Sequence, residues 1–161
     1  MKFEKFDEAS GAFTFRFQGR EYSFFKDLLS DYPLQKGARQ PIGGAENAEE
    51  MAEEQALLEE SLDEHRANSR KQLQDFLAKD ERLARDKCGW KLVLDAPGID
   101  WLLQILNDIR VGSWETLGKP EQGSPAVVKT DEQLRSAAAL QLAGMWQSIL
   151  LHALECKQPW E

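Results

Sequence analysis

The feature that most constrains the fold is a nearly unbroken apolar stretch from Ala137 to Leu154 near the end of the chain. Its isolated polar residues are Gln141, Gln147, Ser148 and His152. Those residues favour a buried helix over a membrane span, which needs about 20 predominantly apolar residues. A helix that is apolar nearly all round is either the central helix of a fold or part of an oligomer interface. We therefore expect other elements, or a second copy of the chain, to cover it.

Helix boundaries near this stretch are marked by capping residues. Thr130 and Gln133 form a capping box, so the last helix should begin there and run to about Glu155. An earlier helix should begin at the N-cap Asp95 and end near Leu117, since glycine and proline follow it. Residues 119–129 then form the loop between these two helices.

Alternating aromatic residues predict a small sheet at the start of the chain. Phe13, Phe15 and Phe17 alternate with polar residues after a polar turn containing Gly11. Period-two alternation is the signature of a strand, and Gly11 can adopt the positive φ that a tight turn needs. The residues from Trp90 to Leu94 read as the only later strand. A lone strand leaves its backbone groups unpaired, so this strand should pair with the N-terminal hairpin.

The region between the hairpin and the later strand is less clearly patterned. A short helix is expected around Arg20 to Asp31, followed by a flexible loop over residues 33–46. Residues 47–87 are highly charged with thin apolar stripes. We expect two surface helices there with a break near Asp63, and one long helix is the alternative. Leu83 is assigned to the second stripe.

Together these patterns predict one mainly α-helical, α+β domain over residues 1–161. It should contain a bundle of about five helices and a small antiparallel sheet, made of the N-terminal hairpin and one later strand. A chain of 161 residues is long enough to bury a sizeable core.

Charge disfavours a nucleic-acid or membrane partner. The net charge is −8, whereas affinity for phosphates comes from Lys and Arg. A DNA-binding reading stays open because bases gather in the second charged helix, but acids are interleaved with them. The bases are Arg66, Arg70, Lys71, Lys79, Arg82, Arg85 and Lys87, and the acids are Asp75, Asp80, Glu81 and Asp86.

Cysteine and histidine usage predicts no metal site and no cofactor. Cys88 and Cys156 have neither metal-ligand spacing nor a disulfide framework, and each is most simply a small buried hydrophobe. A fold that brings them together would create a redox switch. His65 lies in a charged run, while His152 shares a helix face with Glu155 and Cys156 without completing a tetrahedral set. No apolar leader follows Met1, so we expect a cytoplasmic location.

The helix from Asp95 carries a family motif. The sequence of residues 101–110, Trp-Leu-Leu-Gln-Ile-Leu-Asn-Asp-Ile-Arg, resembles a pattern of tryptophan, leucine-asparagine-aspartate, an apolar residue and arginine, with a helix end like Leu117-Gly118. The pattern belongs to the bacterial domain-of-unknown-function family numbered two thousand and seventeen, best known from actinobacteria and often encoded near the adaptor ClpS. Both ends of the chain show weaker similarity, and residues 33–87 show none.

The resemblance implies a helical cytosolic protein without an assigned enzymatic activity. Some actinobacterial members are redox-responsive transcriptional regulators that use paired cysteines. This chain departs from them, because Cys88 and Cys156 are far apart in the sequence.

The motif's polar residues, Asn107, Asp108 and Arg110, form the sharpest candidate site. Asn107 and Arg110 share a helix face, whereas Asp108 points elsewhere, so the three do not form one catalytic set. The simplest reading is that they tie the helix to its neighbours by hydrogen bonds.

The sequence therefore predicts a non-enzymatic regulatory or protein-interaction domain with an unidentified protein partner and a homodimer through the last helix. A redox-responsive transcriptional regulator and an enzyme of unknown type are the alternatives. No deep polar cleft is expected around Asp108 and Arg110.

Overall fold

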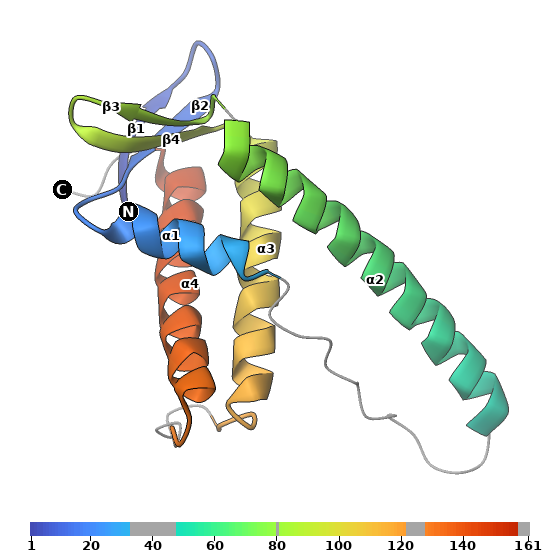
Figure 1. Ribbon diagram of the computed structural model, residues 1–161. Helices are drawn as coiled ribbons and strands as arrows, with labels where there is room; N and C mark the ends of the chain where they lie inside the picture. The colour runs from blue at the N-terminus through green and yellow to red at the C-terminus, as the bar shows by residue number, and fades with distance from the viewer. Residues whose placement is uncertain (33–47, 80, 122–127, 158–161) are drawn as a thin grey trace.

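The computed structural model describes residues 1–32, 48–79, 81–121 and 128–157, which contain helices and one small sheet (Figure 1). Within these residues there are four helices and four strands. In chain order they are β1 (Lys2–Asp7), β2 (Ala12–Arg16), α1 (Glu21–Ser30), α2 (Ala48–Lys79), β3 (Leu83–Asp86), β4 (Gly89–Leu94), α3 (Ala96–Thr116) and α4 (Asp131–Cys156). The mainly helical α+β class is thus confirmed.

The sheet is antiparallel, with strand order β1-β2-β4-β3. The N-terminal hairpin forms as expected, and Gly11 takes a φ of 67° in its turn. The later strand pairs with β2 as expected, with Phe13 opposite Leu94 and Phe15 opposite Leu92. Phe13, Phe15 and Leu92 lie on one face of the sheet. This face is directed to the core, since all three side chains are buried.

The sheet has one more strand than the sequence predicts. β3 places Leu83 opposite Leu92, so Leu83 belongs to the sheet and not to a helical stripe. Only Leu83 of its four residues is buried. Charged residues and shortness are typical of an edge strand, which must not pair with other chains. An edge strand with one buried side chain has no periodicity that a sequence pattern can reveal.

The helices α3 and α4 form an antiparallel pair below the sheet (Figure 1). The predicted caps are present: Asp95 accepts a hydrogen bond from the Gly98 N–H, and Thr130 accepts one from the Gln133 N–H. At the end of α3, Gly118 has a φ of 80°, and the N–H groups of Gly118 and Lys119 donate to Glu115 and Trp114. This is the Schellman arrangement that ends many helices.

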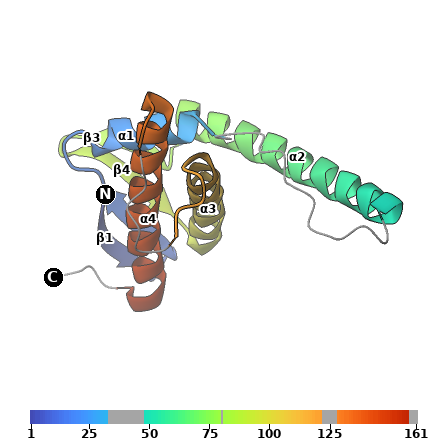
Figure 2. The same ribbon diagram turned by 90° about the horizontal axis from the view of Figure 1, so that it is seen from below.

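The helix α1 crosses α3 and α4 on one side of the molecule (Figure 2). Aromatic contacts fix it there: Tyr22 stacks on Trp90, Phe25 packs edge-on against Trp146, and Phe17 contacts both Tyr22 and Phe25. Aromatic pairs of this kind are worth about 0.5–1.5 kcal/mol beyond their buried area. One cluster of buried side chains draws on every helix and strand.

The predicted break near Asp63 is absent, because α2 is one helix from Ala48 to Lys79. No glycine or proline occurs within it, and most of its residues are good helix formers, so nothing interrupts the backbone hydrogen bonds. The count of helices in the described residues is therefore four instead of the five expected. The expected loop over 33–46 and most of the 119–129 loop lie outside the described residues.

Among the described residues, α4 is the one helix whose length and composition would allow it to cross a membrane. Its side chains Trp146 and Leu150 are fully buried in the shared core, but only 28% of its apolar window is buried. Leu134, Met145 and Leu151 remain exposed on it.

Candidate functional site

Asp108 on α3 is bonded to the residue that closely follows α1. Its Oδ2 accepts a 2.9 Å hydrogen bond from the hydroxyl of Tyr32, which follows α1 and is 3% exposed. Burial raises the pKa of Tyr32, and the hydrogen bond to Asp108 adds to this increase. Ser69 and Arg66 of α2 act on the pKa of Tyr32 in the opposite direction. Tyr32 and Asp108 therefore form a polar junction between α1, α2 and α3.

Arg110 of the same motif faces α4. Its Nη1 donates a 2.8 Å hydrogen bond to Oε1 of the buried Gln147, whose Nε2 donates to the Leu103 carbonyl at 3.3 Å. The Arg110 side chain also passes close to Gly144. Gln147 thus has both its oxygen and its nitrogen bonded to α3. Asn107 is exposed.

The motif residues are therefore directed to different neighbours and do not converge. Asp108 contacts Tyr32, and Arg110 contacts Gln147. Neither Asp108 nor Arg110 lines the groove between the end of α2 and the start of α3 or the groove between α1 and α2. This arrangement can provide hydrogen bonds that connect α3 to its neighbouring helices.

The larger groove, of about 850 Å³, lies where the end of α2 meets the start of α3. Its walls include Phe76 and Trp101, which pack edge to face, and Arg82, which lies over the Phe76 ring. Asp95 in this groove already caps α3. The groove was not foreseen from the sequence, since its walls come from segments that no pattern connects.

A smaller groove, of about 360 Å³, lies between α1 and α2. Leu29, Leu73 and Leu77 contribute its apolar lining, and Lys26 and Arg70 its charges.

The cysteines are free and both are exposed, so neither is the buried hydrophobe that the sequence suggested. Cys88 donates its backbone N–H to Asp86, which binds Arg16, the partner of Lys2 at the start of β1. Cys156 is followed by Lys157, whose ammonium lies over the ring of Phe6 near the end of β1. The two free thiols thus lie on different elements, Cys88 in the turn between β3 and β4 and Cys156 at the end of α4.

The histidines are also separated. His65 is exposed on α2, and His152 is half-buried on α4. Among the described residues, no group of His, Cys, Asp and Glu is placed to hold a metal ion.

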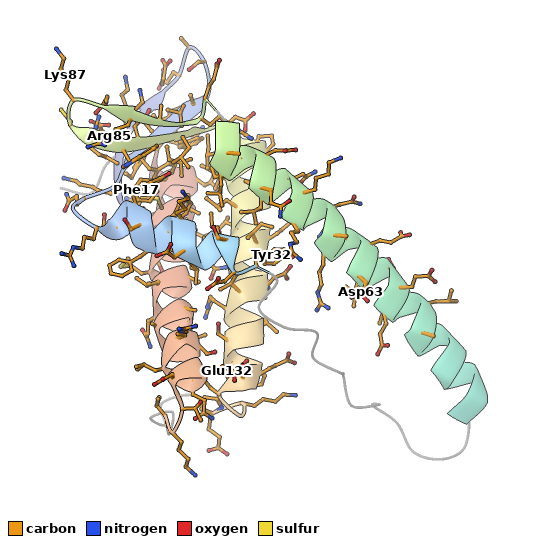
Figure 3. The ribbon with its side chains drawn as sticks, in the orientation of Figure 1. Phe17, Tyr32, Asp63, Arg85, Lys87 and Glu132 are labelled. Atoms are coloured by element: carbon orange, nitrogen blue, oxygen red, sulfur yellow. The ribbon has the colours of Figure 1, made fainter. Side chains whose placement is uncertain are left out.

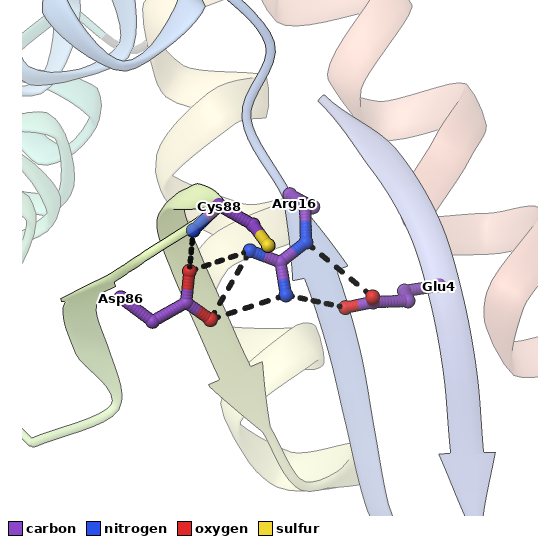
Figure 4. Close-up of polar contacts among 4 residues, drawn as sticks. All are labelled: Glu4, Arg16, Asp86 and Cys88. Carbon is purple, nitrogen blue, oxygen red and sulfur yellow. Dashed lines mark hydrogen bonds and ion pairs between the residues drawn. The ribbon is translucent and has the colours of Figure 1, made fainter.

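Arg16 is the centre of an ion cluster that the sequence did not reveal (Figure 4). Its guanidinium donates to both oxygens of Asp86 and to both oxygens of Glu4, at 2.9–3.3 Å. These bonds, first to Asp86 and then to Glu4, raise the pKa of Arg16, and Arg16 in turn lowers the pKa of Asp86. The cluster joins β1, β2 and the end of β3, so it has a structural role.

The bases proposed as a DNA face do not lie on one helix, because α2 ends at Lys79. Arg85 lies on β3 and Lys87 in the turn that follows (Figure 3). Arg66 lies on α2, 3.6 Å from Asp63. The second charged helix of the sequence prediction is thus divided between a helix and a hairpin.

The long helix α2 extends well beyond the other elements at its N-terminal end (Figures 1 and 2). We call the segment from Ala56 to His65 its free half, because only Leu62 there is half-buried and all other side chains are exposed. Asp63 marks this part in Figure 3. Leu57 is 67% exposed and Leu58 is 54% exposed.

One mainly apolar face runs along α2 from Leu58 to Phe76, and we call it the α2 seam. It comprises Leu58, Leu62, Ser69, Leu73 and Phe76, spaced by three, four or seven residues and hence on one side of a helix. Ser69, Leu73 and Phe76 are buried against the rest of the chain. The same face continues into the free half, where Leu58 is largely exposed.

No family model matches the sequence, no curated protein is significantly similar to it, and no solved structure matches it.

Proposed function

We propose that this chain is a non-enzymatic protein-interaction domain in which the free half of α2 binds another protein. The observation that carries this proposal is the continuation of the α2 seam beyond the body of the molecule. A helix of about 12–15 residues is marginal in water without tertiary packing, so an apolar face on a projecting helix is suited to a partner. The resemblance of Trp101–Arg110 to a family without assigned catalysis agrees with this proposal.

The polar clusters support a non-catalytic role. The hydrogen bonds of Asp108 and Arg110 connect helices, and the contacts of Arg16 connect strands. A catalytic site needs a nucleophile or a base next to a group that orients it, with room for a substrate beside both. We place the protein in the cytoplasm as part of the same proposal.

A site-specific photo-crosslinker tests the proposal. The crosslinking amino acid replaces Leu58 in the full chain, and a matched variant carries it at Val111, an exposed apolar residue on α3. We expect the variant at position 58 to form a discrete crosslinked species in cells of the source organism. The absence of any species specific to position 58 would contradict the proposal.

A homodimer through α4 is a second candidate, favoured by the exposure of Leu134 and Met145 on one side of that helix. Light scattering tests it. We expect twice the 18.3 kDa chain mass, and a reduction to one chain mass in a Leu134→Glu, Met145→Glu double variant. A mass of one chain for the unaltered protein would contradict this candidate.

A further inference from the structure

The free half of α2 is acidic around its leucines. Glu59, Glu60, Asp63 and Glu64 are exposed there, and the sequence from Ala48 to His65 contains no lysine or arginine. The first base is Arg66, which lies 3.6 Å from Asp63 and partly neutralises that carboxylate. The result is a strip of the exposed Leu58 and the half-buried Leu62 with carboxylates beside it, and Arg66 at its C-terminal end is the nearest base.

This charge distribution selects among the occupants of the seam. Pairing the free half with the same segment of a second copy, in either direction, would set carboxylates against carboxylates. Like charges brought together at an interface oppose association. The C-terminal part of α2, which carries its Lys and Arg residues, cannot pair with the free half of a second copy through the α2 seam. Its seam residues Ser69, Leu73 and Phe76 are already buried. A partner that contributes cations to this surface gains from both the leucines and the carboxylates.

We propose that the free half of α2 binds a cationic amphipathic helix of another protein, whose apolar stripe packs on Leu58 and Leu62 and whose Lys or Arg residues face Glu59 and Asp63. This inference rests on the proposed function and specifies the class of partner. Leucines four residues apart on one helix present the spacing that a second helix recognises through anchors at i, i+3 and i+4. The ten described residues of the free half span about 15 Å, enough for roughly three turns of a partner helix.

Fluorescence anisotropy with a synthetic helix tests this inference. The probe is a labelled 18-residue Leu–Lys peptide with leucines at helical spacing. Its two controls are a scrambled peptide of the same composition and a Leu–Glu peptide with the same leucine positions. We expect the full chain to bind the Leu–Lys helix, with affinity that falls as salt rises, and to bind both controls far more weakly. Equal binding of the scrambled peptide would show attraction of charge alone and overturn the inference.

Matched variants locate the binding. Leu58→Ala with Leu62→Ala should weaken binding of the Leu–Lys peptide at least about tenfold, as expected when anchor side chains are truncated. Glu59→Gln with Asp63→Asn should weaken binding and flatten its salt dependence. Val111→Ala, at an exposed apolar position on α3, should leave binding unchanged. An unchanged affinity in the double leucine variant would overturn the inference.

Two outcomes separate this inference from the proposed function. If a crosslinker at position 58 captures a second copy or a protein that binds through an acidic or neutral segment, the interaction role stands and the cationic partner is wrong. If position 58 yields no specific crosslink and the Leu–Lys peptide does not bind, both are wrong.

Discussion

At the residue scale, the motif that looks most like a site in the sequence has structural work in the fold. The sequence alone predicted a polar cluster of Asn107, Asp108 and Arg110. It also predicted that Asp108 points to a different side of the helix from the other two. Their partners could not be read, since Tyr32 and Gln147 are distant in sequence and only the packing of α1 and α4 on α3 brings them near. The Arg16 cluster was hidden for the same reason, because Glu4 and Asp86 meet only across the sheet.

Arg110→Ala should destabilise the chain by about 1–2 kcal/mol, because it leaves the buried Oε1 of Gln147 without its donor. Asn107→Ala, at an exposed position in the same helix, should change the free energy of unfolding by less than about 0.5 kcal/mol. Urea denaturation of both variants measures the difference. Equal stability of the two variants would show that the bond between Arg110 and Gln147 does not stabilise the fold.

Tyr32→Phe should lower stability by about 1 kcal/mol at neutral pH through loss of the hydrogen bond to Asp108. It should also change the response to alkali. Because burial raises the pKa of Tyr32 above its ordinary value, the folded state keeps its proton when the unfolded state begins to lose it near about pH 10. The stabilisation is complete below that pH and declines as the pH rises further.

Urea midpoints measured from pH 8 to 11 check this alkaline dependence. The unaltered chain should lose stability more steeply above about pH 10 than Tyr32→Phe does. Parallel curves would mean that the pKa of Tyr32 is the same in both states.

At the element scale, helices with capping residues were predictable and the charged middle was not. Asp95, Thr130 and Gly118 are local signals that act within a turn or two of the helix, so the boundaries of α3 and α4 follow from them. The continuity of α2 depends on the absence of a breaker. One long helix was the alternative in the sequence prediction, but the thin apolar stripe did not favour it over a break near Asp63. The strand β3 exists because β4 offers it a partner, which is information from outside the segment.

A proline in each half of α2 should distinguish its two parts. Ser61→Pro in the free half should change the unfolding free energy of the body by less than about 0.5 kcal/mol, since it disrupts little packing. Gln72→Pro is at an exposed position in the part of α2 that packs on the body. It should lower the free energy of unfolding by about 3 kcal/mol or more, because it breaks the helix that positions Leu73 and Phe76. Urea unfolding followed by tryptophan fluorescence compares them, and similar losses would show that the free half supports the body.

At the scale of the whole molecule, the chain combines a packed body with an acidic projecting helix. The net charge of −8 follows from the sequence. The sequence did not show that acidic residues lie beside exposed leucines in the free half of α2. Long-range attraction from such a surface speeds encounter with cationic partners and weakens as salt rises. Both cysteines are exposed on the body, one in the β3–β4 turn and one at the end of α4.

A redox role is accordingly expected to need two chains. After peroxide treatment at low protein concentration, non-reducing electrophoresis should show no faster-migrating band from an internal Cys88–Cys156 disulfide. A disulfide-linked dimer that disappears in Cys88→Ser or Cys156→Ser would support the alternative of a redox-responsive regulator. A band shift from an internal bridge would contradict the placement of the two thiols.

We propose that the free half of α2 is the surface that binds a partner. Hydrogen exchange followed by mass spectrometry is the decisive test of this proposal. In the chain alone, backbone amides of residues 56–65 should exchange much faster than those of residues 69–77 in the same helix. With the Leu–Lys peptide bound, protection should rise in residues 56–65 and stay unchanged in α4. Equal protection along α2 in the free chain, or peptide-induced protection outside the free half, would contradict the claim.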